Sequence, residues 1–141
     1  MSATTLRIII ALVLFIHGIG HAMAFLPALG LASTETWHPR SRLLTPLLGD
    51  TVTRIISTIL FLAALFGFVG SALGLMNWLV PHDMWQTFAV VSAVISLLAI
   101  FLFWNSFYSL FPNKVGAIGV DVAVLICLLW LNWPSEADIG F

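Results

Sequence analysis

Three ionisable side chains lie inside long apolar segments of this 141-residue sequence, where they could exchange protons or bind a ligand. His17 and His21 are four residues apart, so a helix would place both imidazoles on one face. Asp121 lies in a second apolar segment, and the amide of Asn105 lies near the end of a third. Because ionisable groups are costly in hydrocarbon, they normally face a protein interior. The sequence therefore predicts a polar ligand-binding cluster of His17, His21, Asn105 and Asp121.

Several kinds of chemistry remain open to this cluster. His21 and Asp121 could pair only to fix the register of two helices. They could instead bind a quinone or another amphipathic head group, with which histidine and aspartate can exchange protons. His17, His21 and Asp121 could share a metal ion, and a histidine could ligate a haem or chlorin, although a second membrane histidine from a facing helix is missing. A proton relay or transport site is the remaining alternative.

The composition indicates that lipid surrounds most of the chain. Hydrophobic residues make up 61% of the sequence and charged residues only 8%, too few to cover a soluble protein of this length. Four apolar segments are each long enough to cross about 30 Å of hydrocarbon at about 1.5 Å per residue. They cover about residues 6–26, 52–78, 84–111 and 115–133, and each is followed by a proline. We expect one all-α domain over residues 1–141, an integral membrane up-down four-helix bundle.

The first segment has some features of a signal peptide. Arg7 precedes an apolar run, and the triplet at 22–24 matches a cleavage site. Two histidines would be unusual in such an apolar core, so we expect a retained transmembrane helix. In an up-down bundle the first and third loops share one side, which predicts His21, Asn105 and Asp121 at one level, roughly 8–9 Å from those loops at the helical rise.

The few charges suggest an orientation and exclude some partners. Four of the five basic residues lie near the first and third loops, namely Arg40, Arg42, Arg54 and Lys114. Arg7 alone lies on the side of the termini and the second loop. The positive-inside rule then places the first and third loops in the cytoplasm and both termini outside, in a multi-pass protein of a bacterial cytoplasmic membrane. Scattered basic residues exclude a nucleic-acid partner, and the lone Cys127 excludes an intrachain disulfide.

Glycines predict where helices approach one another. Gly67, Gly70 and Gly74 form a small-residue stripe in the second segment, and Gly116 and Gly119 repeat it in the fourth. The alternative is that these glycines have no packing role, because glycine is common in membrane helices.

The segment from Leu6 to His21 resembles the opening helix of DoxX-like membrane proteins. Arg7 matches the arginine that begins that helix and Gly18 matches its glycine, while His21 stands where a lysine is frequent. The resemblance implies a small four-helix bundle from a superfamily that includes thiosulphate:quinone oxidoreductase subunits and proteins associated with membrane redox complexes. The lone Cys127 separates this chain from relatives linked to disulfide formation.

The expected function is an accessory or structural subunit of a membrane complex, redox-associated and in contact with a quinone or pigment through His17, His21 and Asp121. The alternative is a membrane oxidoreductase or small transporter with its own ligand or metal at the same residues. The expected partners are the lipid bilayer and other membrane subunits or further copies of the chain.

Overall fold

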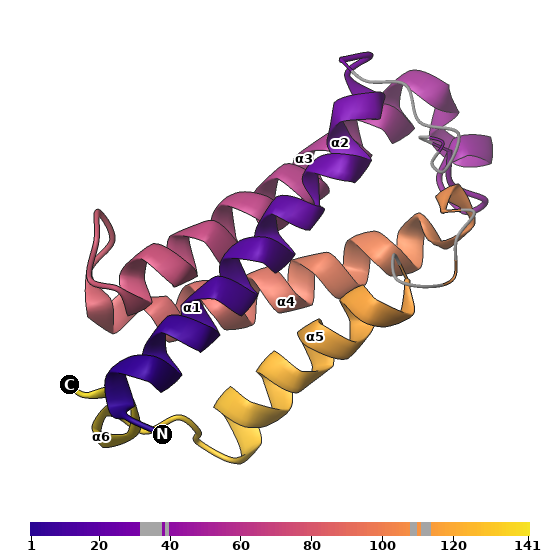
Figure 1. The fold of residues 1–141 in the computed structure, drawn as a ribbon. Helices are drawn as coiled ribbons and strands as arrows, with labels where there is room; N and C mark the ends of the chain where they lie inside the picture. The colour runs from indigo at the N-terminus through magenta and orange to yellow at the C-terminus, as the bar shows by residue number, and fades with distance from the viewer. Residues whose placement is uncertain (32–37, 39, 108–109, 111–113) are drawn as a thin grey trace.

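The computed structural model of the chain describes residues 1–31, 38, 40–107, 110 and 114–141, and within them it contains helices and no β-strand. The elements (Figure 1) are α1 (Ala3–Gly20), α2 (Ala22–Ala28), α3 (Thr45–Leu75), α4 (Trp85–Leu102), α5 (Val115–Leu125) and α6 (Glu136–Ile139), with single turns η1 (His82–Met84), η2 (Trp104–Ser106) and η3 (Ile126–Trp130). The all-α fold class is therefore confirmed for the described residues.

Three helical stretches are long and apolar enough to cross a membrane, which is compatible with an integral membrane protein. They are Ala3–Ala28, Thr45–Leu75 and His82–Leu102. The fourth apolar helix, Val115–Trp130, is shorter. Helix α3 also begins earlier than residue 52, and its first turns are interrupted at Gly49, whose φ of 79° is not helical.

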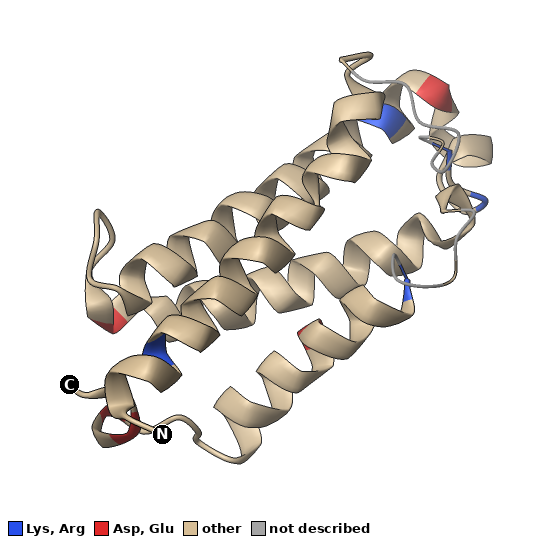
Figure 2. Cartoon of the chain, in the orientation of Figure 1, with Lys and Arg blue, Asp and Glu red and all other residues tan. Residues whose placement is uncertain are grey.

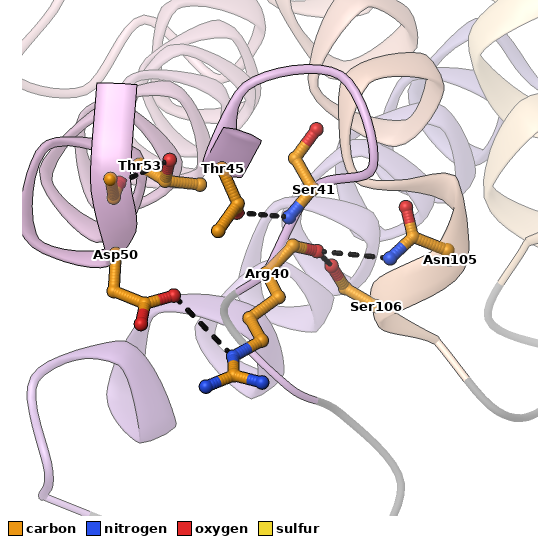
Figure 3. A network of polar contacts seen from close by, with 8 residues as sticks. Arg40, Ser41, Thr45, Asp50, Thr53, Asn105 and Ser106 are labelled. Carbon is orange, nitrogen blue, oxygen red and sulfur yellow. Dashed lines mark hydrogen bonds and ion pairs between the residues drawn. The ribbon is translucent and has the colours of Figure 1, made fainter. Parts of the chain in front are cut away.

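Helix α4 ends at Leu102, well before the predicted end near residue 111. Polar contacts with the segment before α3 replace the helical hydrogen bonds there (Figure 3). The Ser106 hydroxyl and the Asn105 amide both donate to the carbonyl of Arg40. The Ser41 hydroxyl donates to the carbonyl of Leu102 at 2.5 Å. Side chains that hydrogen-bond backbone groups compete with the helix, so this segment turns away from the α4 axis.

Helices α1, α3 and α4 pack closely because small residues lie where they meet. A Cβ added at Gly18 of α1 would lie 3.0 Å from the Cβ of Phe68 in α3. A Cβ at Gly67 would lie 1.8 Å from Ser92 Oγ in α4, and one at Gly74 would lie 3.2 Å from Trp85 Cβ. Gly70 is looser, at 3.7 Å from the Phe88 ring. These glycines allow the close backbone approach that drives helix association in lipid.

The prediction that Gly116 and Gly119 pack against another helix is wrong for Gly119. A Cβ added at Gly119 would meet no atom within 4 Å. Both glycines instead line an open cavity between α1 and α5. The spacing of small residues is the same as in α3, but α5 packs mainly on α4 and leaves this face uncovered.

Basic residues gather at one end of the bundle (Figure 2). Arg40 and Arg42 precede α3, Arg54 lies near its start, and Lys114 precedes α5. Both termini lie at the opposite end (Figure 1), where Arg7 near the start of α1 places its guanidinium over the ring of the C-terminal Phe141. Arg54 donates to the carbonyl of Ala28 at the end of α2 at 2.7 Å, which holds this end of the bundle together.

The C-terminal helix α6 packs beneath α1. Ile139 is fully buried in the main apolar cluster. His82 of η1 contacts the Glu136 carboxylate through Nε2 at 2.8 Å, and its ring stacks on Phe141 at 3.5 Å. The short α6 begins at Ser135, whose side chain and backbone N–H exchange hydrogen bonds with Asp138 in a capping box.

We predict that Gly67→Ala lowers the free energy of unfolding by about 1–3 kcal/mol, because its methyl group would overlap Ser92. Ser92→Ala removes the nearer atom and should restore part of the loss. Gly70→Ala is the matched control in the same helix and should change little. Thermal unfolding in detergent followed by circular dichroism measures this. Equal effects at the two glycines would contradict it.

Acid should loosen the capping box of α6. Hydrogen bonds from the Ser135 side chain, and then from its backbone N–H, lower the pKa of the Asp138 carboxyl. A lowered folded-state pKa stabilises the fold above the unfolded pKa, and this contribution is lost as the pH falls through the folded value. Hydrogen-exchange protection of Ala137–Ile139, corrected for intrinsic exchange, should therefore fall with decreasing pH below about 4. Ser135→Ala should show less of this fall, and an equal fall in that variant would refute the assignment.

Candidate functional site

One carboxylate joins three helices in the interior of the bundle. Asp121 of α5 is completely buried, and its Oδ1 contacts Nε2 of His17 in α1 at 2.8 Å. Its Oδ2 accepts a hydrogen bond from the Ser96 hydroxyl of α4 at 2.5 Å. Both carboxylate oxygens thus have partners. This satisfies a group that would otherwise be very costly to bury.

The contact with Asp121 fixes how His17 presents its ring. An ionised carboxylate can only accept, so with Asp121 ionised Nε2 of His17 carries the proton and Nδ1 is the acceptor nitrogen. Within the described residues Nδ1 of His17 makes no hydrogen bond. The Phe68 ring packs edge-on against the imidazole, with ring centroids 4.6 Å apart. Gly18 helps by letting α1 approach α3 at this level.

His21 lies one turn further along α1 and is only 6% exposed. Its ring stacks on Phe68 with an interplanar angle of 8° and meets the His17 ring edge-on at a centroid distance of 5.0 Å. Its Nε2 has no hydrogen-bond partner in the described part of the chain. A buried polar atom without a partner costs free energy, and a ligand or a water usually supplies the missing bond.

Both histidines line a cavity of about 520 Å³ between α1 and α5. The rest of its wall is almost entirely apolar, with Phe61, Ile100 and Phe107 among its members and Gly20 and Gly116 opening space on facing helices. Ligand sites of small molecules have this size and this mixture of apolar walls with a few polar groups.

The structure brings three of the four predicted residues together, but in a different pairing. His17, not His21, contacts Asp121. Counting residues from the loops fixes a depth only to about one turn, roughly 5.4 Å, and the two histidines differ by one turn.

The prediction that Asn105 joins the cluster is wrong. Asn105 lies in η2, beyond the end of α4, where its Oδ1 accepts from the backbone N–H of Arg42 at 3.0 Å. Its side-chain amide donates to the Arg40 carbonyl (Figure 3). The predicted depth of Asn105 assumed that α4 continues as a helix to about residue 111, and α4 ends at Leu102.

Ser96 is the site residue that the sequence analysis missed. Ser92 and Ser96 are four residues apart in an otherwise apolar α4, and both are buried. A serine hydroxyl in a membrane helix can donate its hydrogen bond to a backbone carbonyl of the same helix. The presence of a serine alone is therefore weak evidence for a binding site. The signal that could have identified it is the i, i+4 spacing, which places both hydroxyls on one face.

The geometry does not favour a metal ion. The described residues contain no group of three or more histidine, cysteine, aspartate or glutamate side chains arranged to hold one. Asp121 already uses both oxygens for His17 and Ser96, which leaves His17 and His21 without a third ligand.

No family model, curated protein or solved structure matches this chain. The DoxX-like resemblance of the first helix therefore rests only on the sequence from Leu6 to His21. The fold and the site define a helical protein with membrane-length helices and an internal serine–aspartate–histidine chain beside an apolar cavity.

We predict that the His17 and Asp121 side chains are energetically coupled. Either His17→Leu or Asp121→Leu leaves a polar partner without its hydrogen bond and should cost about 1–3 kcal/mol. The double variant should be less destabilised than the sum of the two, by about 0.5–2 kcal/mol. Denaturant unfolding in mixed micelles measures the four free energies. Strictly additive effects would contradict the contact.

Proposed function

We propose that this chain is a multi-pass integral membrane protein with four crossings, a DoxX-like bundle with both termini outside the bacterial cytoplasmic membrane. Ala3–Ala28, Thr45–Leu75 and His82–Leu102 supply three crossings. The fourth is α5 with η3, whose eleven and five residues reach about 24 Å at the helical rise. Local thinning of the bilayer accommodates a span shorter than 30 Å at a modest cost. The basic residues at one end support the orientation.

We further propose that the protein is a redox-associated accessory subunit that binds the ring of a quinone-class ligand at His17 and His21. The observation that carries this proposal is the chain from Ser96 through Asp121 to His17 at the wall of an apolar cavity. Nδ1 of His17 accepts a hydrogen bond from a ligand hydroxyl. Asp121 compensates the positive charge of a protonated His17 ring, so the site can take up and return a proton.

The residues that line the cavity suit the ring of such a molecule. Phe61 and Phe107 belong to the apolar wall of this cavity, and His21 adds a polar group beside His17. A ring carbonyl can accept from His21, whose buried Nε2 has no partner among the described residues. The role of accessory subunit follows because the site supplies binding and proton exchange, while electrons come from a partner protein of the complex.

The test is ligand binding to purified protein in lipid nanodiscs. A short-chain benzoquinol should bind to the wild-type protein and bind about tenfold more weakly to His17→Ala and Asp121→Asn, because each loses a charge-assisted hydrogen bond. His82→Ala is the matched control, since His82 contacts Glu136 and does not line the cavity at His17 and His21. Isothermal titration measures the affinities. Wild-type affinity in both site variants would overturn the proposal.

The accessory role has its own test. Affinity purification of the chain from its native membrane under mild detergent should recover a stoichiometric membrane partner together with quinone, as measured by mass spectrometry of proteins and extracted lipids. Recovery of quinone with no partner would favour the alternative of an oxidoreductase or transporter acting alone.

A further inference from the structure

A second cavity adjoins the cavity at the histidines, and together they form a cleft along α1 and α5. The second cavity has a volume of about 370 Å³ and shares three lining residues with the first, namely Val13, Gly116 and Val120. From there it extends past Ile9 on α1 and Leu128 at the opposite end of the bundle. Along α1 and α2 the two cavities together run from Ile9 to Ala24, which is about 22 Å at the helical rise.

The chain itself leaves space unfilled at two glycines, one in the wall of each cavity. A Cβ added at Gly20 of α1 or at Gly119 of α5 would meet no atom within 4 Å. Elsewhere in the bundle, at Gly18 and Gly67, a Cβ would clash. Protein interiors are normally packed to the density of organic crystals, so a long apolar space beside tightly packed helices is suited to another molecule.

We infer that the apolar tail of the quinone-class ligand lies in this α1–α5 cleft, so that one molecule occupies both cavities. The inference rests on the proposed function, because the ring at His17 and His21 anchors the tail. The tail runs from the histidines toward the wall formed by Trp85 and Leu128. Apart from the two histidines, the named lining of the cleft is apolar along its length, as a hydrocarbon tail requires.

A single chain of carbons fits the space better than a transmembrane helix from a partner. A helix about 10 Å across and 22 Å long occupies roughly 1,700 Å³, well above the volumes of the two cavities. A partner helix would also leave the histidines facing an apolar surface. A molecule with one polar ring and one apolar tail matches the distribution of polar groups along the cleft.

Photolabelling tests where the tail lies. The probe is a benzoquinone with a long apolar tail that carries a diazirine near its end, added to the full chain in nanodiscs. Peptide mapping should find the label on residues 9–14 and 123–128, and excess unlabelled quinone should remove it. Label on lipid-facing residues away from the cleft, such as Phe66 of α3, would overturn the inference.

A steric variant gives the second readout. A Cβ added at Gly119 meets no atom within 4 Å, so Gly119→Leu places an apolar side chain in the cleft and should weaken the long-tailed quinone about tenfold. A tailless quinone should bind to this variant as it does to the wild-type protein. Val122→Leu, on the exposed side of the same helix, is the matched control and should affect neither ligand.

The outcomes separate the inference from the function on which it depends. If His17→Ala weakens both quinones while Gly119→Leu weakens neither, the ring site stands and the tail path is wrong. If Gly119→Leu weakens the tailless quinone equally, the cleft does not hold the tail specifically and the inference is also wrong. If neither quinone binds to the wild-type protein, both proposals fall.

Discussion

The structure depends on how one buried carboxylate is satisfied. Asp121 has no exposed surface, and an unpaired carboxylate there would cost several kcal/mol. Ser96 and His17 each take one of its oxygens, so α5 is tied to both α4 and α1 by a single side chain. The contact with His17 matters most for the architecture, because open cavities occupy much of the remaining space between α1 and α5. The carboxylate therefore sets the spacing of two helices whose other facing surfaces do not fill the space between them.

The bundle divides into a tight side and an open side, and the distribution of small residues explains the difference. On the tight side, Gly67 and Gly74 of α3 lie so close to α4 that an added Cβ would crowd its side chains, and Gly18 of α1 lies equally close to α3. On α5, Gly119 faces empty space. Tight packing at Gly18 and Phe68 holds α1 in place, so the imidazoles of His17 and His21 are positioned by a rigid helix. A binding site needs this combination, because the walls must be fixed while the volume between them stays free.

The sequence predicts the membrane-length helices and the close approach of His17, His21 and Asp121, because both follow from the cost of polar groups in hydrocarbon. Prediction from the sequence fails where contacts between distant parts of the chain determine the structure. Helix α4 ends early because Asn105 and Ser106 bind the backbone before α3, a contact between distant parts of the chain. Asp121 contacts His17 rather than His21. The two histidines differ in depth by one helical turn, and counting residues from the loops cannot resolve so small a difference. Ser96 carries no charge, and its spacing from Ser92 indicates a shared helix face but no partner, so its contact with Asp121 is known only once α4 and α5 are placed together.

His17 and His21 are one helical turn apart and have different environments. The proposed site would therefore bind a ligand in one orientation. Nε2 of His17 contacts the Asp121 carboxylate, which orients the ring and would compensate a positive charge on it. His21 stacks on Phe68 and has no carboxylate beside it among the described residues, so a charge on its ring would be uncompensated. His21 is then suited to stay neutral and donate a hydrogen bond. A ligand with one hydroxyl and one carbonyl would distinguish these two rings, whereas a symmetric metal site would need them to be equivalent.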